Sequence, residues 1–267
     1  MTTSVRLAGR AVIEVSGADR VSFLQGLVSN DVAAVGPGVA VWAALLTPQG
    51  KWLADFFMFG SDDAVLLDCE AGQAADIARR LGRYRLRAKV AIAPVDLGVY
   101  AVWAGEPPAA AFAAPDPRLP DAGWRLLSTT PLPVTADEAD YDRHRIELGL
   151  PDGSRDLEAE KSVLLEAGFA ELNGISWTKG CYMGQELTAR TRYRGLLKRR
   201  LVPVRAASDL PEPGAPVLAS GAEVGVLRSH RGEVGLVLLR LDALEAALTC
   251  DGAPIRVSLP DWLERSR

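Results

Sequence analysis

A lone cysteine, Cys181, lies between two glycines in the segment KGCYMGQE, residues 179–186. Glycine lets the backbone take a positive φ, so this spacing predicts a shaped turn rather than the interior of a strand or helix. Residues 185–192 contain no Gly or Pro and carry their acid early and their arginines late, which predicts a short helix. Cys181 would then precede a helix N-terminus with Lys179 nearby. Both neighbours favour the thiolate, which is the reactive form of cysteine.

A second interpretation of the same residues is structural. A single cysteine is often a small buried apolar residue, and glycines often serve only a turn. Local chemistry alone leaves the two interpretations open.

The segment closely resembles the K-G-C-Y/F-x-G-Q-E signature of the YgfZ family, the folate-binding relatives of the aminomethyltransferase (T-protein) of glycine cleavage. The resemblance implies that Cys181 is a functional thiol, accompanied by the other residues of the motif. Those residues are Lys179, Gly180, Tyr182, Gly184, Gln185 and Glu186. It also implies a role in the assembly or maintenance of iron–sulfur enzymes, which in bacteria has been linked to tRNA modification.

Further blocks of the chain resemble the same family, at residues 17–32, 46–51, 145–151 and 190–195. The resemblance implies an α+β fold, an aminomethyltransferase-like ring of two α/β units plus a C-terminal β-barrel. The units surround a folate-sized opening with Cys181 at its rim. We expect residues 1–197 to form two interleaved α+β units, the second at roughly 46–130, and residues 198–267 to form the barrel.

The resemblance also implies a folate site, for tetrahydrofolate or a one-carbon derivative. Arg10 and Tyr141 stand where bacterial members carry two tryptophans. Tyr141 can stack on a pterin, and the Arg10 guanidinium can stack or pair with a glutamyl carboxylate. Asp55 stands where aminomethyltransferases carry an aspartate that engages the reacting nitrogens. It would act as an acceptor or general base, unless it simply faces solvent. Arg145 either contacts the folate or forms an ion pair.

The order of elements agrees with an α+β protein. Strands are expected at 11–15, 39–46, 51–59, 64–69, 90–95, 99–103 and 124–128, and helices at 20–28, 71–81, 136–148 and near 158–165. Residues 105–121, rich in Pro and Ala, are expected to form a loop. After residue 200, short apolar runs separated by Gly, Pro and Asp indicate a small β-barrel or sandwich.

Composition narrows the functional classes. The chain has 267 residues, a net charge of −4 and 24% charged residues, so bulk attraction to nucleic acid is not expected. Two local basic runs remain, at 79–89 and 190–200. The first is interpreted as a solvated face, and the second as a contact for a ligand or partner.

The N-terminus lacks a signal-peptide core, and the longest apolar run, Val39–Leu46, is too short to cross a bilayer. The three cysteines form no C-x-x-C pair, so we expect no metal site and a cytoplasmic location.

These observations predict a folate-binding protein that supports iron–sulfur enzymes and contacts client proteins or assembly factors. Two alternatives stay open: a folate-dependent one-carbon transferase or demethylase with Asp55 as its base, and a tRNA-modification factor that binds RNA through residues 190–200. Glycine cleavage itself is not expected, because aminomethyltransferases do not carry this cysteine motif.

Overall fold

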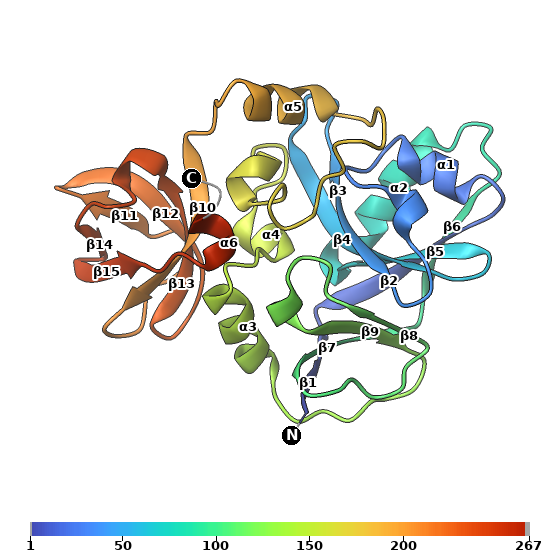
Figure 1. Cartoon of the computed structure of the whole chain (residues 1–267), viewed down its shortest axis with the longest axis horizontal. Coiled ribbons are helices and arrows are strands. Elements are labelled where there is room, and N and C mark those ends of the chain that lie inside the picture. The colour runs from blue at the N-terminus through green and yellow to red at the C-terminus, as the bar shows by residue number, and fades with distance from the viewer. Residues whose placement is uncertain (1, 265–267) are drawn as a thin grey trace.

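The computed structural model describes residues 2–264, which form two sheets and a barrel (Figure 1). At its centre lies a hairpin of β3 (Ala40–Leu46) and β4 (Trp52–Gly60). Every residue of β3 is buried. Its even-numbered side chains pack into one core cluster and its odd-numbered side chains from residue 41 into another, because alternate strand residues point to opposite faces. A strand covered on both faces therefore reads as a continuous apolar run.

This hairpin belongs to a five-stranded sheet in the order β3-β4-β5-β2-β6. The other strands are β2 (Arg10–Ser16), β5 (Ala64–Glu70) and β6 (Ala91–Val95). Two helices pack into the second core cluster, α1 (Arg20–Gln25) through Leu24 and α2 (Ala74–Tyr84) through Ile77 and Leu81. Both helices were expected, although the first is three residues shorter than predicted at its C-terminal end.

A second sheet has the order β1-β7-β9-β8. Its strands are β1 (Thr3–Arg6), β7 (Gly98–Ala104), β8 (Phe112–Pro115) and β9 (Trp124–Ser128). Strand β8 lies inside the segment predicted as a loop. It forms because it pairs antiparallel with β9, a tertiary contact that overrides its Pro- and Ala-rich composition.

The C-terminal strands close into a barrel in the order β10-β13-β12-β11-β14-β15, with β15 pairing back onto β10. The strands are β10 (Arg199–Ala206), β11 (Pro216–Ala219), β12 (Ala222–Arg231), β13 (Val234–Arg240), β14 (Leu248–Cys250) and β15 (Ala253–Val257). The predicted α+β class with a C-terminal β-barrel is confirmed. Residues 265–267 of the expected barrel unit lie outside the described part of the chain.

The segment that connects β9 to β10, residues 129–198, carries α3 (Glu138–Glu147), α4 (Gly153–Asp156) and α5 (Gln185–Tyr193). Helix α6 (Asp261–Glu264) follows the last barrel strand. Short 3-10 turns occur at Val32–Ala34, Ala71–Gln73, Pro120–Ala122, Leu164–Ala167 and Leu241–Ala243. The helix expected near 158–165 is absent, and turns followed by the Leu164–Ala167 helix occupy that stretch. None of the helices in residues 2–264 has the length and apolar character needed to cross a membrane.

Arg145 of α3 joins this connecting segment to the barrel. Its side chain is 1% exposed, and it pairs with Asp142 at 2.9 Å and with Asp156 of α4 at 2.8 Å. A further donor reaches the hydroxyl of Ser229 on β12 at 3.2 Å. Since a buried charge is tolerated only when it is paired and hydrogen-bonded, this cluster fixes α3, α4 and the barrel relative to one another.

A second contact fixes the segment before α5. Gly184 has φ +81°, and a Cβ atom built there would lie 2.5 Å from the carbonyl oxygen of Thr47 and 3.0 Å from the Cα of Gly50. The two glycines therefore let the β3–β4 turn and the cysteine segment approach more closely than any side chain permits.

We predict that Arg145→Met lowers the free energy of unfolding by about 3–5 kcal/mol, because it leaves the carboxylate of Asp156 buried without its arginine and removes one of the arginines that pair with Asp142. The matched control is Arg143→Met, two residues away on α3. That side chain is 42% exposed and should cost less than about 1 kcal/mol. Urea denaturation measures both, and equal losses would contradict the assignment.

We predict a similar contrast between two glycines. Gly184→Ala should lose about 2–4 kcal/mol, because it combines an unfavourable φ with a backbone collision. Gly180 has φ +98° but no atom within 4 Å of an added Cβ, so Gly180→Ala should lose only about 1–2 kcal/mol. The comparison uses chemical unfolding, and an equal or larger loss at Gly180 would show that the close contact is unimportant.

Candidate functional site

Cys181 is the exposed cysteine of the chain, whereas Cys69 and Cys250 are buried. The loop that carries it is anchored on both sides. On one side the Lys179 ammonium donates to the carbonyl oxygens of Val28 and Asn30, each at 2.7 Å. On the other side the backbone N–H of Met183 donates to the carbonyl of Gly26 at 3.0 Å. The thiol is therefore presented to solvent at the tip of a loop held at its base.

The hydrogen bonds of Lys179 go to the backbone of the loop's support. We expected it to favour the Cys181 thiolate, but its ammonium is directed to two backbone carbonyls, and no hydrogen bond joins it to Cys181 within residues 2–264. Burial lowers the pKa of Lys179 to about 8. Its ammonium also lies 5.3 Å from the centroid of the Tyr182 ring. The structure thus makes Lys179 an anchor of the loop.

The other motif residues support the same loop. Tyr182 is 7% exposed and packs into the main core cluster, and burial raises the pKa of its hydroxyl to about 12. The side chain of Gln185, the first residue of α5, accepts from the Tyr182 N–H at 3.3 Å. Glu186 follows it, exposed in the first turn of the helix. The predicted helix after the cysteine is confirmed.

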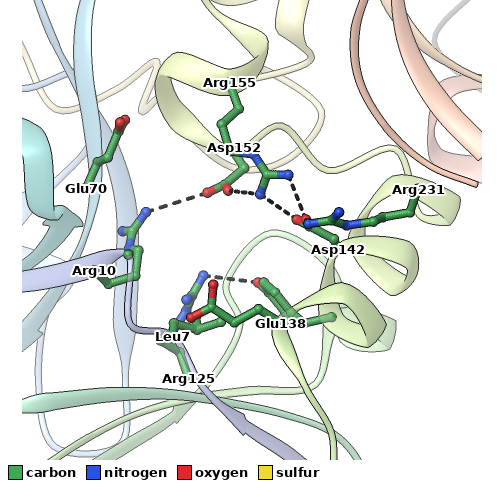
Figure 2. Close-up of a pocket in the computed structure, with 11 residues that line it drawn as sticks. Leu7, Arg10, Glu70, Arg125, Glu138, Asp142, Asp152, Arg155 and Arg231 are labelled. Atoms are coloured by element: carbon green, nitrogen blue, oxygen red, sulfur yellow. Dashed lines mark hydrogen bonds and ion pairs between the residues drawn. The ribbon is translucent and has the colours of Figure 1, made fainter. Parts of the chain in front are cut away.

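A cavity of about 400 Å³ lies between the start of β2, the sheet of β9 and helix α3 (Figure 2). Eleven residues line it, and most of them are charged: Leu7, Gly9, Arg10, Glu70, Arg125, Glu138, Tyr141, Asp142, Asp152, Arg155 and Arg231. Two of the residues predicted for a folate site, Arg10 and Tyr141, are among them. They are 131 positions apart in the sequence, and only the fold brings them together.

Arg10 lines the cavity, and two carboxylates of the protein already neutralise its charge. Its side chain is 8% exposed and pairs with Asp68 at 2.7 Å and with Asp152 at 3.7 Å. Neighbouring side chains cover most of the ring of Tyr141. Tyr141 is 7% exposed, its ring centroid lies 5.7 Å from that of Trp103, and the Arg125 guanidinium lies 5.8 Å from it. Little of the Tyr141 side chain is therefore open to the cavity.

Asp55 and Arg145, also predicted for the site, are not among the lining residues. Asp55 is 5% exposed and accepts hydrogen bonds from the indole N–H groups of Trp42 at 2.9 Å and Trp52 at 3.1 Å. Burial raises its pKa to about 6, although both indole bonds oppose this rise. Asp55 therefore does not face solvent, and it does not line this cavity. Arg145 does not line the cavity, but it pairs with Asp142, which does.

Arg125 is a residue of this cavity that the sequence analysis missed. It is 3% exposed, and its Nη2 donates to the Tyr141 hydroxyl at 3.2 Å. Its Nε lies 3.6 Å from Asp68 Oδ2, too far for a hydrogen bond, and both Nε and Nη1 have no hydrogen-bond partner within residues 2–264. The available signal was an arginine inside the otherwise apolar strand Trp124–Ser128.

The two basic runs differ in their surroundings. In the first, Arg79 and Arg80 both pair with Asp76, which agrees with a solvated face. In the second, the Arg192 guanidinium lies 3.9 Å from the centre of the Trp177 ring, four residues before Cys181. Arg190 and Arg194 are exposed and have no acidic partner in the described part of the chain. A cationic surface thus adjoins the cysteine loop.

The thiol and the cavity are separate sites. Cys181 was expected at the rim of the folate opening, but it does not line the cavity of Arg10 and Tyr141. Helix α5 and the loop before it lie at the opposite edge of the molecule from β1 and the N-terminal end of α3 (Figure 1). Within residues 2–264, no group of three His, Cys, Asp or Glu side chains is placed to hold a metal ion.

Comparisons with known proteins agree with this architecture. Residues 198–265 match the family model for the CAF17 C-terminal beta-barrel domain. The solved structure of the glycine cleavage system aminomethyltransferase T from Bartonella henselae superposes with a TM-score of 0.76, covering 98% of this chain and 86% of that one. Its sequence identity is 14%, so this likeness shows the fold alone.

Two curated relatives share most of the sequence. The mitochondrial iron–sulfur cluster assembly factor IBA57 of Homo sapiens is 37% identical, over 96% of this chain and 84% of its own. The protein of the same name from Mus musculus is 34% identical, over 97% and 85%.

The names of these relatives correct two expectations. The relatives are named mitochondrial, so the expected cytoplasmic location is wrong. They carry the name IBA57, and the more specific YgfZ assignment is not confirmed. Identity of 34–37% along nearly the whole chain and most of each relative shows the family. The chain belongs to the IBA57 family of iron–sulfur cluster assembly factors.

Proposed function

We propose that this protein supports the assembly or maintenance of iron–sulfur clusters by presenting Cys181 to a partner protein. A second part of the proposal is that its cavity binds tetrahydrofolate or a one-carbon derivative. The observation that carries the first part is the position of Cys181. It is the exposed thiol of a chain whose relatives are named iron–sulfur cluster assembly factors.

The construction of the loop supports a functional thiol. Cys181 lies between the Lys179 anchor and the close contact of Gly184 with the β3–β4 turn. Both contacts restrict the loop, while Cys181 itself packs into none of the core clusters. A cysteine with only a packing role would be buried, as Cys69 and Cys250 are.

The presence of a single exposed thiol limits how many ligands this chain can give to an iron–sulfur cluster. Iron–sulfur clusters are usually held by several thiolates, and this chain can offer one at its surface. The other ligands of any cluster that Cys181 contacts must therefore come from the partner. The exposed arginines of α5 favour a partner with an acidic surface, because opposite charges steer association.

The cavity supports the folate part of the proposal. Its volume of about 400 Å³ falls in the range of small-molecule sites. Arg10, Arg125 and Tyr141 line it, so that two guanidinium groups and one aromatic side chain are brought together. These residues fit a planar ligand with acceptor oxygens.

We do not extend the proposal to one-carbon transfer, because the base that it requires, Asp55, lies outside the cavity. The arginines of residues 190–200 would also suit the phosphates of tRNA. The net charge of −4 and the names of the relatives favour a protein partner instead.

We predict that Cys181→Ser keeps the fold but loses the support of iron–sulfur enzyme activity in cells that depend on this protein. The matched control is Cys250→Ala, which removes a buried thiol from the barrel and should leave that support intact. In the purified native protein a thiol reagent should modify one cysteine rapidly, and Cys181→Ser should abolish that phase. Full complementation by Cys181→Ser would show that the motif is structural.

For the folate part, titration with tetrahydrofolate and its one-carbon forms should show stoichiometric binding to the wild type. Tyr141→Ala should weaken it about tenfold or more, because one aromatic contact and the hydroxyl that accepts from Arg125 are lost. Tyr100→Ala removes another buried tyrosine outside the cavity and controls for lost stability. Absence of binding to the wild type would reject the folate part and leave the thiol part standing.

A further inference from the structure

The segment that ends α2 and leads toward β6 is basic and exposed. Residues 83–89 read RYRLRAK and contain no acid. Their four basic side chains are exposed, and none has an acidic partner within residues 2–264: Arg83, Arg85, Arg87 and Lys89. The solvated face of α2, where Arg79 and Arg80 pair with Asp76, therefore ends before this segment.

Two large apolar side chains alternate with these charges. Leu86 is 89% exposed, and Tyr84 is 42% exposed. Leu86 also has φ +43°, a left-handed conformation that a leucine adopts only at an energetic cost. An exposed leucine in such a conformation adds nothing to the stability of the isolated chain. Its position is explained if the side chain packs against another molecule.

A small cavity connects this segment with the cysteine loop. Its volume is about 240 Å³, and its wall combines the end of α2, the β3–β4 turn and the cysteine loop. Arg83 and Tyr84 line it from α2, and Met183 lines it from the loop. Met183 follows Cys181 by two residues, a stretch of chain that spans at most about 7 Å. A protein that fills this cavity therefore has Cys181 close beside it.

The lining of the cavity indicates what it would accept. Leu45, Leu53 and Met183 make part of its wall apolar. The carboxylate in the wall, Glu160, lies 3.8 Å from Arg80, whereas Arg83 has no carboxylate partner in the described part of the chain. An apolar side chain flanked by carboxylates would fit both the apolar and the cationic parts of this wall.

The same composition favours a protein over a nucleic acid. Arginine, tyrosine and methionine are enriched in protein interfaces, and the aliphatic side chain of Leu86 cannot stack on a base. The net charge of the chain is −4, so its attraction to polyanions is confined to local surfaces. One bond from Cys181 to a shared cluster cannot position a partner, because a stable interface buries about 800 Å² on each side. The partner therefore needs a contact surface beside the cysteine loop.

We propose that residues 83–89 and this cavity form a docking surface for an acidic protein. A segment of that partner packs an apolar side chain against Leu86 and the cavity wall, while its carboxylates pair with the arginines of the segment. This inference rests on the proposed function, because the partner is the one to which Cys181 is presented. It adds the place where that partner binds and the chemistry of the segment that it uses.

Thiol–disulfide exchange at Cys181 tests this surface with a defined probe. The probe is an acidic peptide that carries a leucine among glutamates and a cysteine held as its mixed disulfide with thiopyridine. A matched neutral peptide has glutamine in place of each glutamate. At low salt the wild type should react about tenfold faster with the acidic peptide than with the neutral one, and added salt should remove the difference. Equal rates for the two peptides would overturn the proposal, and Cys181→Ser should react with neither.

Charge variants locate the effect. Arg83→Gln combined with Arg85→Gln should remove most of the preference for the acidic peptide and leave the rate with the neutral peptide unchanged. The matched control is Arg6→Gln combined with Arg256→Gln. It removes the same charge from two exposed arginines that do not line the cavity, and it should keep the preference.

Two results would assign the binding elsewhere. A preference that Arg190→Gln with Arg194→Gln abolishes, and that Arg83→Gln with Arg85→Gln keeps, would place docking on α5 and overturn the proposal. Binding of tRNA that depends on Arg83 and Arg85, without any preference for the acidic peptide, would identify a nucleic-acid surface and overturn it too.

Leu86→Gly separates docking from folding. Glycine adopts φ +43° without strain, so this variant should not lower the melting temperature. It should nevertheless slow the reaction with the acidic peptide about threefold or more, because the apolar contact is lost. An unchanged rate would contradict the packing proposed for Leu86.

Complementation in cells separates this inference from the proposed function. Arg83→Glu combined with Arg85→Glu should reduce the support of iron–sulfur enzyme activity, whereas Arg6→Glu combined with Arg256→Glu should not. Full support by the first variant, in cells where Cys181→Ser fails, would overturn the docking surface and leave the thiol function standing. Full support by Cys181→Ser would overturn both.

Discussion

A guanidinium removed from water must find its acceptors inside the protein, and much of this structure is arranged around that requirement. Arg145 meets it by collecting Asp142, Asp156 and Ser229, and so joins α3, α4 and the barrel. Arg118 meets it with Asp116 and the carbonyl of Pro151. Because breaking such a pair leaves an uncompensated buried charge, these contacts hold the three parts in one arrangement. The cavity wall follows the same rule, because its arginines Arg10, Arg155 and Arg231 also pair with carboxylates.

Around the ring of Phe57 three of these arginines come together. The guanidiniums of Arg10, Arg118 and Arg125 lie 5.7, 4.9 and 4.2 Å from its centroid. An aromatic face stabilises a nearby cation, so a single apolar side chain supports the charged wall from behind. The carboxylate of Asp68 lies between Arg10 and Arg125. This arrangement keeps the cavity polar in the middle of an otherwise apolar core.

The position of the cysteine loop depends on a different constraint, the close approach of its backbone to the β3–β4 turn. Gly50 and Gly184 leave no room for side chains between the β3–β4 turn and the cysteine loop. Lys179 then ties the loop to the segment after α1. Segments distant in the sequence therefore converge to present one exposed sulfur. Cys181 is not among the residues that line the cavity, so the thiol and the cavity are separate sites.

Several features followed from the sequence alone because they depend on local patterns. The central hairpin, α2, α3 and the barrel strands each have a clear apolar period or turn signal, and the G-C-x-x-G spacing predicted the shaped loop. What required the tertiary structure were contacts between distant residues. Strand β8 exists because β9 pairs with it, and Asp55 is held in the core because two indoles reach its carboxylate. Arg125 was overlooked although it interrupts an apolar strand, because the sequence does not show which side chains that strand faces. The separation of Cys181 from the cavity was unforeseen, because distances between remote residues depend on how the whole chain packs.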